Sequence, residues 1–188
     1  MSKIDYTYPL YARYLHLGMA AFGIAAWLTA EGAHGEADSN GYLLHAYLGL
    51  SLAAFVLVRL LNGVASSGPL HFSGWSPFSG RQWSLAFQDI KCLLRFSVPE
   101  RGMHEGLAGL TQAFGLILFS WMGLSGSAMF VLGGGAESEL YEAIEEAHEI
   151  GETLIPLYLV LHVGSVLVHS LAGQHIWRRM WTFGQRSR

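Results

Sequence analysis

The hydrophobic residues of the chain fall into four long runs separated by polar segments. The runs lie near 11–29, 42–61, 107–132 and 153–172, and each holds about twenty mostly apolar residues with almost no charge. A helix needs about 20 such residues to cross a hydrocarbon layer of roughly 30 Å. The pattern therefore predicts an all-α membrane protein, with a single transmembrane domain over 1–188 formed by a bundle of four transmembrane helices.

The segment between the second and third runs, 62–105, is too long for a simple turn. Its second part, WSLAFQDIKCLLRF, places apolar residues on one helical face, with Lys91 and Arg95 beside them. The residues of this apolar stripe are Trp83, Phe87, Ile90, Leu94 and Phe96. The pattern predicts an amphipathic cytoplasmic helix that either lies on the inner leaflet or packs on the bundle.

The composition supports a membrane protein and limits the cofactor chemistry. Of the 188 residues, 52% are hydrophobic and only 13% are charged. The hydrophobic fraction exceeds the apolar content that a soluble core needs. The single cysteine, Cys92, excludes an intrachain disulfide and a CxxCH site for a covalently attached haem. The N-terminal MSKIDYTYPL lacks the features of a signal peptide, so we expect the first helix to be retained.

The charges are distributed asymmetrically and predict a topology. The eleven Lys and Arg residues lie near the termini or at and between helices two and three: Lys3, Arg13, Arg59, Arg81, Lys91, Arg95, Arg101, Arg178, Arg179, Arg186 and Arg188. The other two connections carry only acidic charges: Glu31, Glu36 and Asp38, then Glu137, Glu139, Glu142, Glu145, Glu146, Glu149 and Glu152. The positive-inside rule then places both termini in the cytoplasm and the acidic loops outside.

Four of the nine histidines lie in or beside the apolar runs, at two depths. His16 is in the inner part of helix one and His45 is near the outer end of helix two. His148 marks the outer end of helix four, which we expect to begin before this residue, and His162 follows fourteen residues later. Fourteen residues advance a helix by about 21 Å and leave the two side chains roughly 40° apart on one face.

These depths predict two histidine pairs across the bundle. His45 would meet His148 on the outer side, and His16 would meet His162 on the inner side. Two histidines fill both axial positions of a haem iron, so the pattern predicts two non-covalent haems b that transfer electrons. Alternatively, the histidines are polar residues that form hydrogen bonds between helices.

Three further residues are candidate cofactor ligands on the inner side. Arg59 lies fourteen residues beyond His45 and could bind a haem propionate or extend to the lipid headgroups. His169 follows His162 by seven residues and could bind a quinone carbonyl, a propionate or water. His104, in GMHEGLAGL, is a similar candidate at the start of helix three.

The sequence resembles the bacterial cytochrome b561 family together with the b-type cytochrome subunit of nickel–iron hydrogenases. The resemblance is carried by YLHLGMAAF around His16, LLHAYLGLSLAAFVLVRLL from His45, and HEIGETLIPLYLVLH from His148 to His162. It implies an outer haem held by helices two and four and an inner haem held by helices one and four, which gives the same pairs. The GMHEGL segment around His104 lacks the Asn-Pro of the family's GHNPLG-type sequence.

The resemblance also implies a function. We expect a dihaem cytochrome b of the bacterial inner membrane that passes electrons between a periplasmic redox protein and a quinone. The partner would be a cytochrome c or an oxidoreductase subunit, and the quinone ubiquinone or menaquinone. Two alternatives remain: a quinone-linked oxidoreductase that acts directly on a small outer-face molecule, and a haem-free membrane anchor.

Overall fold

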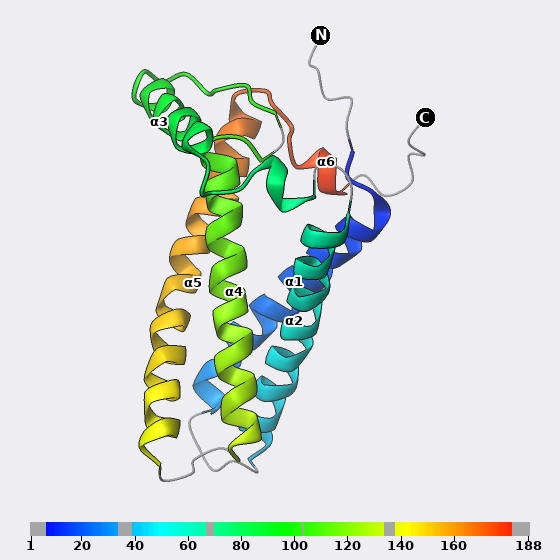
Figure 1. The fold of residues 1–188 in the computed structure, drawn as a ribbon, viewed down its shortest axis with the longest axis vertical. Coiled ribbons are helices and arrows are strands. Elements are labelled where there is room, and N and C mark those ends of the chain that lie inside the picture. The colour runs from blue at the N-terminus through cyan, green and yellow to red at the C-terminus, as the bar shows by residue number, and fades with distance from the viewer. Residues whose placement is uncertain (1–6, 34–38, 67–69, 103, 134–137, 182–188) are drawn as a thin grey trace. The chain divides into compact units, whose positions relative to one another are not determined.

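The computed structural model describes residues 7–33, 39–66, 70–102, 104–133 and 138–181 (Figure 1). In this part of the chain every regular element is a helix: α1 Leu10–Leu28, η1 Ala30–Ala33, α2 Asn40–Ala65, η2 Phe72–Gly74, α3 Gly80–Leu94, α4 Leu107–Val131, α5 Glu139–Leu171 and α6 Arg178–Trp181. The prediction of an all-α protein is confirmed. Six charges used to predict the topology lie outside the described residues: Lys3, Glu36, Asp38, Glu137, Arg186 and Arg188.

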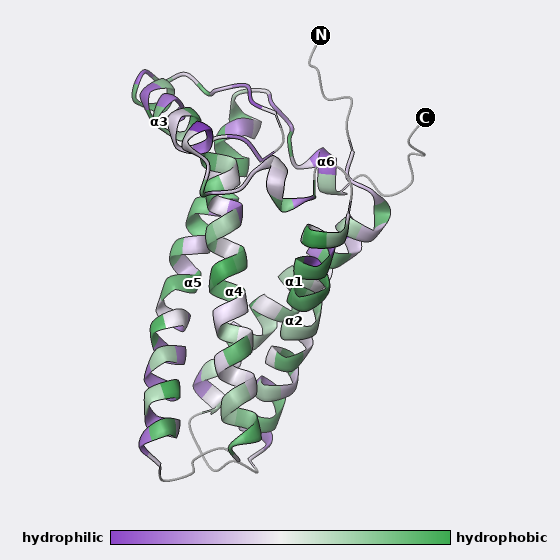
Figure 2. Cartoon of the chain, viewed as in Figure 1, coloured by the Kyte–Doolittle hydropathy of each residue, from purple (hydrophilic) through white to green (hydrophobic). Residues whose placement is uncertain are grey.

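Three of these helices are long and apolar enough to cross a membrane. Within the described residues they are α2, α4 and α5, and Figure 2 shows the hydrophobic colouring along them. Few of their side chains are buried inside the protein, as expected where lipid covers a helix. Helix α1 is not among them, because Arg13 and His16 interrupt its apolar sequence. A fourth span therefore remains a prediction.

The chain forms two compact units. The first comprises Met1–His16, Asn62–Gly115 and Tyr158–Arg188, and the second comprises Leu17–Leu61 and Leu116–Leu157. Each of the four long helices contributes residues to both units.

Small residues bring the helices of the second unit into close contact. A Cβ atom on Gly18 of α1 would overlap the ring of Phe55 on α2, and that ring packs on Phe22 with 5.4 Å between centroids. A Cβ on Gly123 of α4 would lie 3.0 Å from the Cβ of Ala53. Such contacts are typical of membrane helices, which associate through van der Waals packing rather than through the hydrophobic effect.

Helix α3, in the first unit, packs with its polar face toward the protein. Gln82, Ala86 and Asp89 are buried, whereas Trp83 and Phe87 are exposed. The side-chain oxygen of Ser79 caps the helix by accepting from the Gln82 N–H at 3.2 Å. The predicted amphipathic helix is therefore present, and its apolar stripe is not the face that packs on the protein.

The contact between Gly18 and Phe55 gives a stability prediction. We expect Gly18→Ala to lower the free energy of unfolding by about 1–3 kcal/mol, because the added methyl group displaces the ring of Phe55. Gly164→Ala on α5 is the matched control, since a Cβ there meets no atom within 4 Å. The control should raise stability by about 0.5–1 kcal/mol, because alanine in a helix interior loses less conformational entropy on folding than glycine does. Thermal unfolding in detergent measures both, and equal effects would contradict the packing described.

Candidate functional site

The four histidines singled out in the sequence form two pairs, one in each unit. In the second unit, the ring centres of His45 on α2 and His148 on α5 are 6.2 Å apart, with the rings 84° from parallel. In the first unit, the ring centres of His16 on α1 and His162 on α5 are 6.0 Å apart, with 40° between the rings. The structure thus brings together the same partners that their depths in the sequence suggested.

Hydrogen bonds determine which nitrogen is protonated in His45 and His148. His45 Nδ1 lies 2.9 Å from the Ala26 carbonyl oxygen, which can only accept, so Nδ1 carries the proton. His148 Nδ1 lies 2.8 Å from Ser125 Oγ, and that hydroxyl donates its own hydrogen to the Trp121 carbonyl at 2.8 Å. With that hydrogen on the Trp121 carbonyl, His148 Nδ1 is the donor to Ser125. In both rings Nε2 is left as an unprotonated, basic ligand atom.

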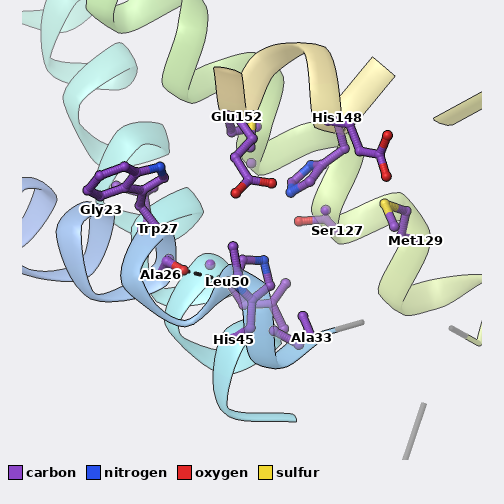
Figure 3. A pocket seen from close by; sticks show the side chains of 18 of the residues that line it. Gly23, Ala26, Trp27, Ala33, His45, Leu50, Ser127, Met129, His148 and Glu152 are labelled. Atoms are coloured by element: carbon purple, nitrogen blue, oxygen red, sulfur yellow. Dashed lines mark hydrogen bonds between the residues drawn. The ribbon is translucent and has the colours of Figure 1, made fainter. Parts of the chain in front are cut away.

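A cavity of about 190 Å³ surrounds this pair. His45 and His148 reach it from α2 and α5 (Figure 3). Glycines lie along its wall, and Gly126 is so close to His148 that a Cβ there would be 3.2 Å from the ring. Typical ligand sites measure roughly 300–1,000 Å³, so a large planar ligand would require the lining side chains to move apart.

The cavity wall is acidic as well as apolar. Glu145, Glu149 and Glu152 of α5 line it, and Glu152 is seen beside His148 in Figure 3. Among the described residues that line the cavity there is no Lys or Arg. The wall therefore disfavours a free anionic ligand.

The spacing of the His45–His148 pair fits one metal ion between two imidazoles, and the His16–His162 pair is 0.2 Å closer together. Metal–nitrogen bonds of about 2.0–2.1 Å, with roughly 1.1 Å from each nitrogen to its ring centre, separate the ring centres by about 6.2–6.4 Å. The observed separations are 6.2 and 6.0 Å. No group of three or more His, Cys, Asp or Glu side chains that could hold a metal occurs within the described ranges. Two protein ligands suit a haem, whose macrocycle supplies the other four nitrogens.

Aromatic side chains position the pair in the first unit. The ring of Tyr158 stacks on His162, with 5.4 Å between centroids and 17° between planes. Trp181 meets His16 edge-on at 6.3 Å. A Cβ on Gly115 would overlap the ring of Tyr158, so a residue without a side chain is required there on α4. The orientation of His162 thus depends on the packing of α4 against α5.

His104 and His169, both in the first unit, have separate partners. His104 Nε2 is 2.8 Å from the Tyr8 hydroxyl, its ring centre is 5.4 Å from that of Trp75, and its backbone has a φ of 58°. His169 Nδ1–H donates a hydrogen bond to Gln174 Oε1 at 2.7 Å, which leaves Nε2 as the basic nitrogen.

Arg59, the third inner-side candidate, is a buried residue of α2. It belongs to the second unit, with His45 and His148, whereas His104 and His169 belong to the first.

Sequence reasoning missed the residues that orient the histidines. Tyr158 could have been found, because it precedes His162 by four residues and such residues are neighbours on a helix. Ser125 and Ala26 gave no signal, since each lies on a different helix from the histidine to which it bonds. Trp181 likewise contacts His16 from the far end of the chain.

Comparison with known proteins identifies a family. A family model described as prokaryotic cytochrome b561 matches residues 7–183, nearly the whole chain. No curated protein and no solved structure matches the chain. The resemblance noted in the sequence is confirmed by this match.

Proposed function

The chain belongs to the prokaryotic cytochrome b561 family, and we propose that it holds two haems b and transfers electrons between a quinone and a periplasmic protein. Members of the family are membrane-integral cytochromes that bind b-type haem and transfer electrons. The number of haems, the quinone and the partner are our proposals.

The observation that supports two haems is the geometry of the two histidine pairs. The ring centres of the two pairs are 6.0 and 6.2 Å apart, so each pair could hold one iron, and His45 and His148 both keep Nε2 available. We propose that His45 and His148 bind one haem and that His16 and His162 bind the other. A haem with two histidine ligands supplies a reversible one-electron carrier with no open position for oxygen.

The protein would tune this carrier through the groups bonded to Nδ1. An acceptor on Nδ1–H fixes the tautomer and increases the basicity of Nε2. The Ala26 carbonyl has this role for His45 and Ser125 Oγ for His148. A more basic ligand stabilises the ferric state, so these bonds would lower the potential of the haem.

For the topology we propose four membrane spans with both termini in the cytoplasm. Helix α1 would be the fourth span, and its interrupting residue Arg13 is buried and donates to the Tyr8 carbonyl at 2.6 Å. A buried, bonded arginine near a helix end is compatible with a membrane helix. The acidic residues of α5 from Glu139 to Glu152 would then face the periplasm.

These acidic residues support a basic periplasmic partner. Glu142, Glu145 and Glu146 stand on the same helix as His148, and their charge would attract a cationic redox protein toward the haem there. The same charges argue against direct oxidation of a small anion, since no Lys or Arg among the described cavity residues would hold it.

A quinone is proposed to bind at the cytoplasmic side, next to His169. Because Gln174 accepts from Nδ1, His169 Nε2 is an acceptor and suits removal of the proton from a quinol hydroxyl. His104 is a weaker candidate, since its ring is bonded to Tyr8 and it sits between Tyr8 and Trp75. Arg59 is proposed to bind a haem propionate.

The haem content tests the central proposal. Purified protein should contain two non-covalent, low-spin haems b per chain in a pyridine haemochrome assay, whereas His148→Ala and His162→Ala should each retain one. The absorption and paramagnetic resonance spectra should show that the two variants lose different haems. A wild-type protein with one haem would refute the two-haem assignment, and one with none would support a membrane anchor.

The bond from His148 to Ser125 gives a second prediction. Ser125→Ala removes the acceptor, so the ligand becomes less basic and the potential of that haem should rise by about 20–60 mV, as a net hydrogen-bond contribution near 1 kcal/mol implies for one electron. Spectroelectrochemical titration measures the change. Ser127→Ala, on the same helix and at the same cavity, is the matched control. Equal shifts in both variants, or a shift of the other haem, would contradict the assignment.

The quinone proposal is tested by the kinetics of haem reduction. His169→Ala should slow reduction by a quinol at least about tenfold, because the proton acceptor is lost, while both haem spectra stay unchanged. His175→Ala controls for the loss of a histidine from the same segment, since His175 is exposed. Unchanged kinetics in His169→Ala would place the quinone elsewhere.

A further inference from the structure

Helix α3 presents its apolar side chains outward and its polar side chains inward. Trp83, Phe87, Ile90 and Leu94 are between 42% and 76% exposed. On the opposite face Asp89 is only 2% exposed. A helix on the surface of a soluble protein shows the reverse arrangement. The exposed apolar stripe therefore requires a partner that is itself apolar.

The polar contacts hold the stripe in this orientation. Gln82 Nε2 donates to the His104 carbonyl at 2.8 Å. The Asp89 carboxylate accepts from the backbone N–H of Leu107 at 3.0 Å and from Arg101 Nε at 2.8 Å. Rotation of α3 to bury its stripe would leave this buried carboxylate without its partners, at a large cost.

The same contacts locate α3 at a membrane boundary. Leu107 is the first residue of α4, which is long and apolar enough to span a membrane. The ribbon likewise shows α3 beside the N-terminal end of α4 (Figure 1). A helix bonded to the end of a membrane span lies where the hydrocarbon layer meets the headgroups.

Phe96, just beyond α3, adds an independent observation. The Phe96 N–H donates to the Leu93 carbonyl at 2.9 Å, and the Ser97 N–H donates to the Cys92 carbonyl at 2.9 Å. These two bonds form a Schellman motif, in which the residue with positive φ is usually glycine. Phe96 takes that position with a φ of 55°, and its side chain is 100% exposed. Strain at a bulky residue that packs on nothing in the fold indicates that the ring is used elsewhere.

The charges beside the stripe indicate which surface is bound. Lys91 and Arg95 are exposed and follow the stripe residues Ile90 and Leu94 in the sequence. Aromatic and aliphatic side chains next to Lys and Arg are the composition of helices that lie on anionic lipid surfaces. Each such cation gains free energy near a negatively charged leaflet.

We propose that α3 and Phe96 form a membrane-surface anchor. The stripe of Trp83, Phe87, Ile90 and Leu94, extended by Phe96, inserts at the boundary between headgroups and acyl chains, while Lys91 and Arg95 bind the phosphates of anionic lipids. The polar face of the helix meanwhile holds the start of α4. This anchor does not depend on the haems or on the quinone site.

Spin labels on the whole protein test the anchor. With Cys92 replaced by serine, a single cysteine is placed at Phe87, in the stripe, or at Gln88, which is exposed on another side of the helix. The protein is reconstituted in vesicles of phosphatidylcholine and phosphatidylglycerol. Accessibility of the nitroxide to oxygen and to a water-soluble nickel chelate is then measured.

We expect the label at 87 to be accessible to oxygen and protected from the nickel chelate, and the label at 88 to show the opposite. Two outcomes overturn the proposal. If both labels are accessible to the chelate, the stripe is in water. If the label at 87 is shielded from both reagents and its spectrum is broadened by a neighbouring spin, a second copy of the chain covers the stripe.

Substitution of Phe96 separates anchoring from folding. Phe96→Gly should raise the thermal stability in detergent, because glycine adopts a positive φ without strain, yet increase access of the nickel chelate to a label at 87. Phe96→Leu retains both the apolar side chain and the strain and should change neither. A more stable Phe96→Gly protein with unchanged accessibility would show that the ring takes no part in the anchor.

Discussion

An imidazole within an apolar helix has two ring nitrogens, and the protein must bond one of them before the other can serve as a ligand. In lipid there is no water to satisfy the remaining nitrogen, so its partner has to come from a neighbouring helix. Ala26 and Ser125 provide these partners for His45 and His148. For His45 and His148, the choice of tautomer and the direction of Nε2 depend on these two bonds.

The close packing of the helices follows from the same requirement. A partner on another helix is useful only if it comes within about 3 Å, so the helices must approach closely. Gly126 beside His148 and Gly115 beneath Tyr158 permit this approach. The glycines at the helix contacts therefore determine the orientation of the imidazole rings as well as the distance between the helices.

The parts of this arrangement that could be predicted from the sequence are those set by periodicity and composition. The helices and the pairing of His45 with His148 and of His16 with His162 follow from the apolar runs and from the spacing of histidines along them. The family follows from the resemblance of the segments around these histidines. The number of membrane spans is harder to predict from the sequence, because Arg13 lowers the hydropathy of α1. The burial of Arg13 depends on the rest of the fold. Ser125 could not be found, since its role arises only when α4 meets α5.

The orientation of α3 could not be predicted for a similar reason. Its periodicity showed an apolar stripe, but which face meets the protein is determined by Gln82 and Asp89, whose partners lie in the distant segment at His104 and Leu107. The apolar stripe dominates the pattern in the sequence. The buried polar contacts, which are fewer, determine the structure because an unpaired buried carboxylate costs more than an exposed aromatic ring.

The polar contacts of α3 also impose an order on biosynthesis. Because α3 precedes Arg101, His104 and Leu107 in the chain, it leaves the ribosome before they do, and until they emerge Asp89 and Gln82 lack the partners described here. If the proposed anchor holds, an emerged α3 would adsorb to the bilayer through its aromatic stripe, with its polar face toward water. The start of α4 would then meet a helix that the lipid surface has already oriented, so the leaflet would set the orientation of this part of the fold.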